Sequence, residues 1–183
     1  MGTNEFTLIA ATYALEEDAL SDYHDVRGVY DQAGYAQADI RHPAAPHTFD
    51  AAVVSKYTDG KVYIVERVEE PTRQGGAAGL VTGLAAGALV ALFPEIAIGP
   101  GLAVGGSSGT AIGATAGHVT RGMRRGDLKD LGELLDRGQS GLVVVTEPDL
   151  VDRVEAAITR GKEIVHKPVG IDVSGLKTDI DTL

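Results

Sequence analysis

The sequence has no cysteine and no tryptophan, and it has only three phenylalanines and six tyrosines. Without cysteine, neither a disulfide framework nor a thiolate metal site can form. Basic residues are also scarce, because 16 Lys and Arg stand against 26 Asp and Glu, a formal net charge of −10. A protein that wraps nucleic acid needs a basic surplus to neutralise phosphates. We therefore expect no nucleic-acid partner.

A cleavable signal peptide is not predicted either. The stretch from Met1 to Leu8 contains no basic residue, and Glu16, Glu17 and Asp18 interrupt the apolar residues that follow. The remaining composition, 44% hydrophobic and 23% charged, is typical of a folded domain. We expect a cytoplasmic protein.

Glycine, by contrast, is abundant and concentrated in one segment. Twelve of the 24 glycines lie between Gly75 and Gly117, and Glu95 is the only formally charged residue of the segment 74–120. We therefore expect an acidic body, formed by 1–73 and 121–183, that carries an uncharged Ala/Gly-rich insert at 74–120. Inside the insert, glycines recur at four-residue intervals: Gly75, Gly79, Gly83, Gly87, Gly101, Gly105, Gly109, Gly113 and Gly117.

The four-residue interval predicts two helices with a smooth glycine face. An interval of four is close to one helical turn, so the glycines line one side of each helix and let another helix backbone approach closely. Each helical glycine costs about 0.8–1 kcal/mol relative to alanine, so packing must compensate. The prolines of Phe93–Gly101 break the helical pattern. The insert is therefore predicted to be a glycine-zipper helical hairpin.

Two environments are open for this hairpin. The first arm, Gly75–Phe93, would be about 28 Å long, close to the thickness of a bilayer core, whereas Ser and Thr dilute the second arm. The hairpin is thus either buried between subunits or associated with, or inserted in, the cytoplasmic membrane; the third alternative, a flexible low-complexity loop, is disfavoured by the regular spacing. Arg121, Arg124 and Arg125 follow the second arm; they would contact lipid head groups, or stabilise the helix end and pair with the acidic body.

The sequence pattern predicts an α+β fold for the body. Strands are predicted over Glu5–Tyr13, Phe49–Tyr57, Lys61–Val68, Gly141–Thr146 and Glu163–His166. Helices are predicted over Leu15–Ala33, from an N-cap at Asp127 to Gly138, and from Pro148 to Gly161. The first six elements have the β-α-β-β-α-β order of a ferredoxin-like sandwich, and an extra α-β follows. In that fold the helices cover one sheet face and leave the other open.

Two segments after the insert carry a resemblance to a known family. They are Asp127-Leu128-Lys129-Asp130-Leu131-Gly132-Glu133-Leu134-Leu135 and Gly138-Gln139-Ser140-Gly141-Leu142-Val143-Val144-Val145. In these two segments and in its glycine pattern, the chain resembles a bacterial family catalogued as a domain of unknown function and labelled a predicted membrane protein. The resemblance covers most of the chain, best from Gly75 to His166. It implies a stress-associated, membrane-associated protein and brings no catalytic residues.

Three patterns in the sequence could carry chemistry. His42 and His47, with Asp39 or Asp50, have a spacing that could hold a metal ion, but solvated loop histidines are the favoured interpretation. The neighbours His24 and Asp25 point about 100° apart on a helix and are better read as surface residues. The segment Gly105–Gly109 lacks the Gly-Lys-Ser/Thr ending of a phosphate loop. We predict no cofactor, metal or catalytic residue.

The function predicted from these patterns is non-enzymatic self-association. The spaced glycines would bring helices of separate copies together, with the lipid bilayer as a second contact. The alternative from another class is a small-ligand-binding or enzymatic dimer that uses the open face of a ferredoxin-like sheet. Its candidate lining residues are Lys56, Tyr57 and Tyr63.

Overall fold

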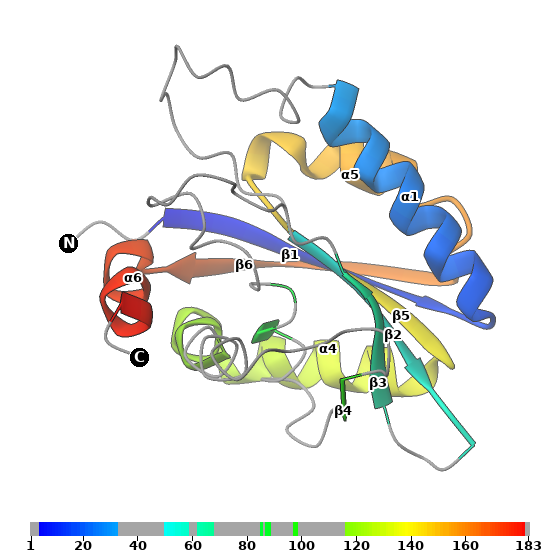
Figure 1. Cartoon of the computed structure of the whole chain (residues 1–183), viewed down its shortest axis with the longest axis horizontal. Coiled ribbons are helices and arrows are strands. Elements are labelled where there is room, and N and C mark those ends of the chain that lie inside the picture. Colours follow the sequence, from blue (N-terminus) through cyan, green and yellow to red (C-terminus); the bar gives the residue numbers. More distant parts are fainter. Residues whose placement is uncertain are drawn as a thin grey trace.

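The computed structural model describes residues 4–32, 50–58, 62–67, 85, 87–88, 97–98 and 116–181. It confirms the α+β class (Figure 1). The strands are β1 (Asn4–Tyr13), β2 (Asp50–Lys56), β3 (Val62–Arg67), β4 (Ala97–Ile98), β5 (Ser140–Thr146) and β6 (Glu163–Ile171). The helices are α1 (Glu16–Gln32), α4 (Arg125–Arg137), α5 (Val151–Ala157) and α6 (Val173–Asp181), with a 3-10 turn at Pro148–Leu150 and a helical segment at 116–122.

The strands form one sheet in the order β4-β3-β2-β5-β1-β6. Every neighbouring pair is antiparallel except β3 and the two-residue β4, which run parallel. The strands that α1 connects, β1 and β2, are separated by β5. The predicted element order is present, but the ferredoxin-like topology is not confirmed.

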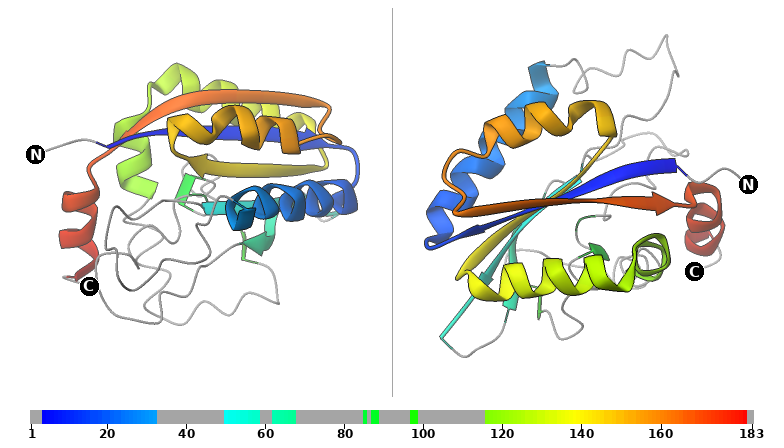
Figure 2. Two further views of the ribbon diagram at one scale, coloured as in Figure 1. Left: turned by 90° about the horizontal axis from the view of Figure 1, so that it is seen from above. Right: turned by 180° about the vertical axis from the view of Figure 1, so that it is seen from behind.

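Helices cover both faces of this sheet, so the expected open face is wrong. Helices α1 and α5 lie on one face, and α4 lies on the other (Figures 1 and 2). Successive side chains of a strand point to opposite faces. In β5, Leu142 and Val144 pack under α1 and α5, whereas Val143 and Val145 pack under α4, and all four are fully buried. We call these the α1/α5 face and the α4 face.

Most predicted boundaries hold to within two residues, and three do not. The helix predicted to run to Gly161 ends at Ala157. Helix α4 begins at Arg125 with Arg124 as its N-cap, so Asp127 lies in the first turn and is not the cap. Strand β6 continues to Ile171, five residues beyond the predicted end. Helix α6 was not predicted; it begins after Asp172, whose Oδ1 accepts a hydrogen bond from the backbone N–H of Gly175 at 3.0 Å.

The described parts of the insert lie against the body. Ala85, Gly87 and Ala88 have helical backbone and are buried, and the backbone N–H of Ala85 donates to Oδ2 of the buried Asp50 at 3.0 Å. Strand β4, from the predicted turn between the arms, pairs with Tyr63 and Ile64 of β3. A straight arm would hold this turn about 28 Å from the hairpin base, whereas the structure has it beside the body sheet.

Candidate functional site

Two of the nine spaced glycines fall in the described part of the chain. Gly87 is buried against the body, and Gly117 lies in the helical segment 116–122. The other seven lie outside the described residues, and they are Gly75, Gly79, Gly83, Gly101, Gly105, Gly109 and Gly113.

The helical segment 116–122 uses its two glycines differently. A Cβ atom added to Gly122 would lie 1.9 Å from the carbonyl oxygen of Gly170, so the helix backbone rests directly on β6 there. Among the described residues, a Cβ added to Gly117 would meet only the guanidinium of Arg121, at 4.0 Å. Five residues turn a helix by about 140° beyond a full revolution. Gly117 therefore lies on the side of the helix that faces away from β6.

The arginine cluster flanks this outward side. Arg121, Arg124 and Arg125 are all exposed, and none of them forms an ion pair with a described residue. Arg121 stands in the last turn of 116–122, where a cation is favourable. Arg124 and Arg125 stand at the N-terminal end of α4, where the helix dipole disfavours a cation. The predicted salt bridges from these arginines to the acidic body are thus not present among the described residues.

On the opposite side, the helical segment is tied to α6. His118 is buried, and its Nε2 lies 2.9 Å from Oδ2 of Asp179. Val119 and Met123 join the apolar cluster of the α4 face together with Leu176 of α6. The base of the insert is therefore fixed to the body by its inner face. The opposite face, which carries Gly117, takes no part in these contacts.

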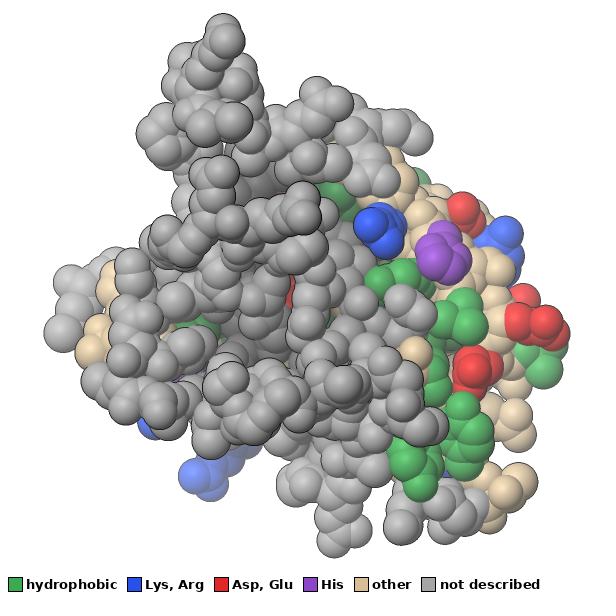
Figure 3. Space-filling view, in the orientation of Figure 1, with side chains coloured by type: hydrophobic (Ala, Val, Ile, Leu, Met, Phe, Trp, Pro, Cys, Tyr) green, Lys and Arg blue, Asp and Glu red, His purple; other side chains and the backbone are tan. Residues whose placement is uncertain are grey.

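The residues of the alternative function do not form one site. Lys56 lines a shallow hollow, open to solvent, between the end of β2 and the start of β5. Tyr57 and Tyr63 lie outside that lining; their rings meet edge to face at 5.2 Å, and the Tyr57 hydroxyl donates to Glu16 at 3.4 Å. Hydrophobic and acidic side chains gather on this side of the molecule (Figure 3).

The other candidate chemistry is not assembled in the described part of the chain. His42, His47, Asp39 and Gly105–Gly109 lie outside it. Asp50 is buried and accepts the Ala85 amide instead. No group of three His, Asp or Glu that could hold a metal occurs among the described residues.

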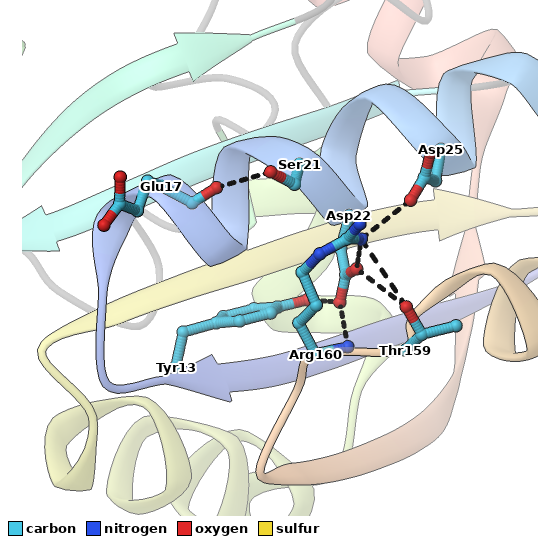
Figure 4. Close-up of polar contacts among 7 residues, drawn as sticks. All are labelled: Tyr13, Glu17, Ser21, Asp22, Asp25, Thr159 and Arg160. Atoms are coloured by element: carbon cyan, nitrogen blue, oxygen red, sulfur yellow. Dashed lines mark hydrogen bonds and ion pairs between the residues drawn. The ribbon is translucent and has the colours of Figure 1, made fainter.

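The most connected polar cluster was not predicted, and it centres on Asp22 of α1 (Figure 4). Asp22 is fully buried. Its Oδ2 accepts the Tyr13 hydroxyl at 3.1 Å and the backbone N–H of Arg160 at 2.9 Å, and its Oδ1 accepts Nη1 of Arg160 at 2.7 Å and the Thr159 hydroxyl at 3.5 Å. The same Nη1 donates to Asp25 at 2.8 Å. Asp25 is thus engaged with Arg160, and His24 contacts the ring of Tyr23 instead.

The electrostatics of this cluster favour a structural role. Burial and the adjacent Asp22 carboxylate raise the pKa of Tyr13 far above its ordinary value, and hydrogen bonds to Asp25 and Asp22 raise the pKa of Arg160. Both groups therefore keep their protons at neutral pH. The Asp22 carboxylate is surrounded by four donors, so it joins β1, α1 and the loop before β6 and offers no oxygen for proton transfer.

Comparison of the chain with protein-family models, curated proteins and solved structures finds no match. Among the described residues, no helix has the length and apolar character needed to cross a membrane. The predicted resemblance to a bacterial membrane-protein family stays a prediction.

Proposed function

We propose that this chain is a non-enzymatic protein that associates with copies of itself through the glycine-patterned insert. The observation that carries the proposal is the outward face of helix 116–122. This helix already brings its backbone against β6 at Gly122, while Gly117, which belongs to the four-residue pattern, has open space beside it. A second helix backbone fits such a space because, among the described residues, only the end of Arg121 comes near it.

The inner face of the same helix is occupied, which limits where a partner can bind. His118 contacts Asp179, and Val119 and Met123 are buried. A partner that docks on 116–122 must therefore use the side of Gly117 and Arg121. The guanidinium of Arg121 lies close to the open space at Gly117, so the partner face should carry a carboxylate or another acceptor there.

Membrane association is the second part of the proposal, in a surface form. Three exposed arginines without an ion-pair partner in the described chain give the acidic protein one basic patch, at Arg121, Arg124 and Arg125. A cluster of this kind is attracted to anionic lipid at about 1 kcal/mol per basic residue. The pairing of β4 with β3 favours contact at the surface over insertion of the hairpin.

Self-association is tested by replacing Gly117 with Leu and measuring native mass by light scattering. Among the described residues of one copy the new side chain meets only the flexible end of Arg121, so the fold should survive while the assembly mass falls. Gly132→Leu is the matched control, because Gly132 is a helical glycine with nothing within 4 Å of its Cβ position and lies outside the pattern. Unchanged mass in Gly117→Leu, or equal loss in both variants, would contradict the proposal.

The lipid contact has a separate test. Vesicles of phosphatidylcholine with and without phosphatidylserine are mixed with the full chain and sedimented. Binding that requires phosphatidylserine and disappears when the three arginines become glutamine supports the patch. Equal binding of the triple variant assigns the contact to another surface.

A further inference from the structure

The edge of the sheet at β6 offers a second, independent surface. The backbone N–H of Lys162, in the bend before β6 and outside its alternation, donates to the carbonyl of Thr12 at 2.8 Å, so the Thr12 carbonyl points toward β6. The N–H and C=O of one strand residue point to the same side, and the side alternates along the strand. The even-numbered residues of β1 therefore bond to β6, through the odd-numbered positions 163–171 that stand opposite them.

The even-numbered residues of β6 consequently direct their backbone groups outward. Two further observations agree. Pro168, which has no N–H, occupies one of these outward positions, where the sheet loses no bond. The carbonyl of Gly170, another outward position, is the atom that the backbone of Gly122 approaches. Past β6 the described sheet has no further strand, so Ile164 and His166 present their N–H and C=O groups at the edge.

The segment that carries these groups, for which no bond to a described residue occurs on the outward side, is complementary to itself. When two β6 strands pair antiparallel with Val165 opposite Val165, Ile164 of one copy exchanges both hydrogen bonds with His166 of the other, and the reverse exchange completes four bonds. In the same register Glu163 of one copy stands opposite Lys167 of the other on both sides of the centre. Within its own copy Lys167 also pairs with Asp127 at 3.0 Å and with Asp130 at 3.2 Å. Opposite charges placed directly across an antiparallel pair are stabilising, and both Pro168 residues fall outside the four bonds.

We propose that β6 of one copy pairs with β6 of a second copy in this register, which joins the two sheets across a twofold axis. The β6 edge crosses the molecule between α5 and α4 in the view from behind (Figure 2, right). Helix 116–122 limits the pairing at the Gly170 end, and Pro168 interrupts the row of donors. Only the window 163–167 is available, so a single register is selected. This interface does not depend on the glycine pattern.

A single cysteine tests the register. The natural sequence contains none, so Val165→Cys places one thiol per chain at the twofold centre. Opposed residues of a non-hydrogen-bonded antiparallel pair have Cα atoms about 4.5 Å apart, within the roughly 4.4–6.8 Å of a disulfide. We expect mild oxidation to convert Val165→Cys to covalent dimer at least tenfold faster than Glu163→Cys. In the latter, the two Cα atoms would lie about 13 Å apart, four residues along the strand. Equal rates would overturn the proposal.

A backbone variant tests the hydrogen bonds. His166→Pro removes an outward N–H that makes no bond inside the sheet, whereas His166→Ala keeps it and loses only the side-chain contact with Glu155. We expect the native mass of His166→Pro to be half that of His166→Ala. Equal masses in two variants with unchanged circular dichroism would refute the pairing. If Gly117→Leu still forms the Val165→Cys crosslink, the strand interface stands whether or not the glycine interface exists.

Discussion

In the Asp22 cluster, we expect the contributions of Tyr13 and Asp22 to the free energy of unfolding to be coupled. Asp22 is fully buried and accepts from the Tyr13 hydroxyl, from the backbone and side chain of Arg160, and from Thr159. Removing one member of a buried ion pair costs about 3–5 kcal/mol because its partner loses compensation. Since Arg160 is 41% exposed and reaches water, we expect Asp22→Ala to lower the free energy of unfolding by about 3 kcal/mol.

Tyr13→Phe removes a single hydrogen bond to a charged acceptor, which is worth about 1.5 kcal/mol. In the Asp22→Ala background the same substitution should behave differently. There the Tyr13 hydroxyl is already buried without its acceptor, and deleting an unsatisfied buried hydroxyl is neutral or stabilising. The coupling energy between the two substitutions should therefore be at least about 1.5 kcal/mol.

The coupling energy is measured by urea unfolding, followed by far-ultraviolet circular dichroism, of four proteins: the natural chain, Tyr13→Phe, Asp22→Ala and the double variant. The matched control is Ser21→Ala, because in the described part of the chain the Ser21 hydroxyl bonds only to the Glu17 carbonyl, on the exposed side of α1. That change should add independently to Asp22→Ala. If Tyr13→Phe costs the same in both backgrounds, the hydroxyl does not interact with Asp22 and the description of the cluster is wrong.

Three further predictions concern other contacts. The pKa of Tyr13 is raised in the folded protein, so the stability that Tyr13 contributes is complete below pH 10 and is lost as the pH rises above it, where the unfolded chain releases the proton first. The free energy of unfolding, measured at pH 9–11, should therefore fall less steeply in Tyr13→Phe than in the natural protein. Gly122→Ala, which sets a Cβ 1.9 Å from the Gly170 carbonyl oxygen, should destabilise by about 1–3 kcal/mol in urea unfolding, whereas Gly132→Ala should stabilise by up to about 1 kcal/mol. Asp50→Ala should speed hydrogen exchange at the Ala85 amide by at least tenfold, and Asp50→Asn, which keeps an acceptor, should speed it less.

The sequence predicts the secondary structure of the body well because its signals are local. The strand and helix of the first 32 residues, the two strands around Thr58 and the strand of Leu142–Val145 all lie within a few residues of their predicted bounds. Strand β6 is underestimated because Pro168 and Gly170 read as strand breakers. Only the register shows that Pro168 occupies an outward position, where its missing N–H costs the sheet nothing.

The Asp22 cluster shows why sites are harder to predict than elements. Arg160 lies 138 residues from Asp22 along the chain, and no motif connects them. A local signal did exist, because Asp22 falls among Ala19, Tyr23 and Val26, which form the buried face of α1. A carboxylate on that face requires donors from another element, although the helical pattern cannot say which element supplies them.

The continuous apolar run of β5 also indicates that both faces of the sheet are covered. A strand covered on one face alternates apolar and polar residues, whereas Leu142-Val143-Val144-Val145 has no polar position and therefore needs cover on both sides. In a sheet of this kind a partner cannot reach the faces, and it must use an edge or the outside of a helix. Among the described residues, the two such surfaces proposed here are the β6 edge at Ile164 and His166 and the side of helix 116–122 that carries Gly117. If both interfaces form, assembly should be stepwise: His166→Pro halves the mass, Gly117→Leu reduces it to a dimer, and the double variant leaves a monomer. A double variant that keeps the full mass would require a third surface.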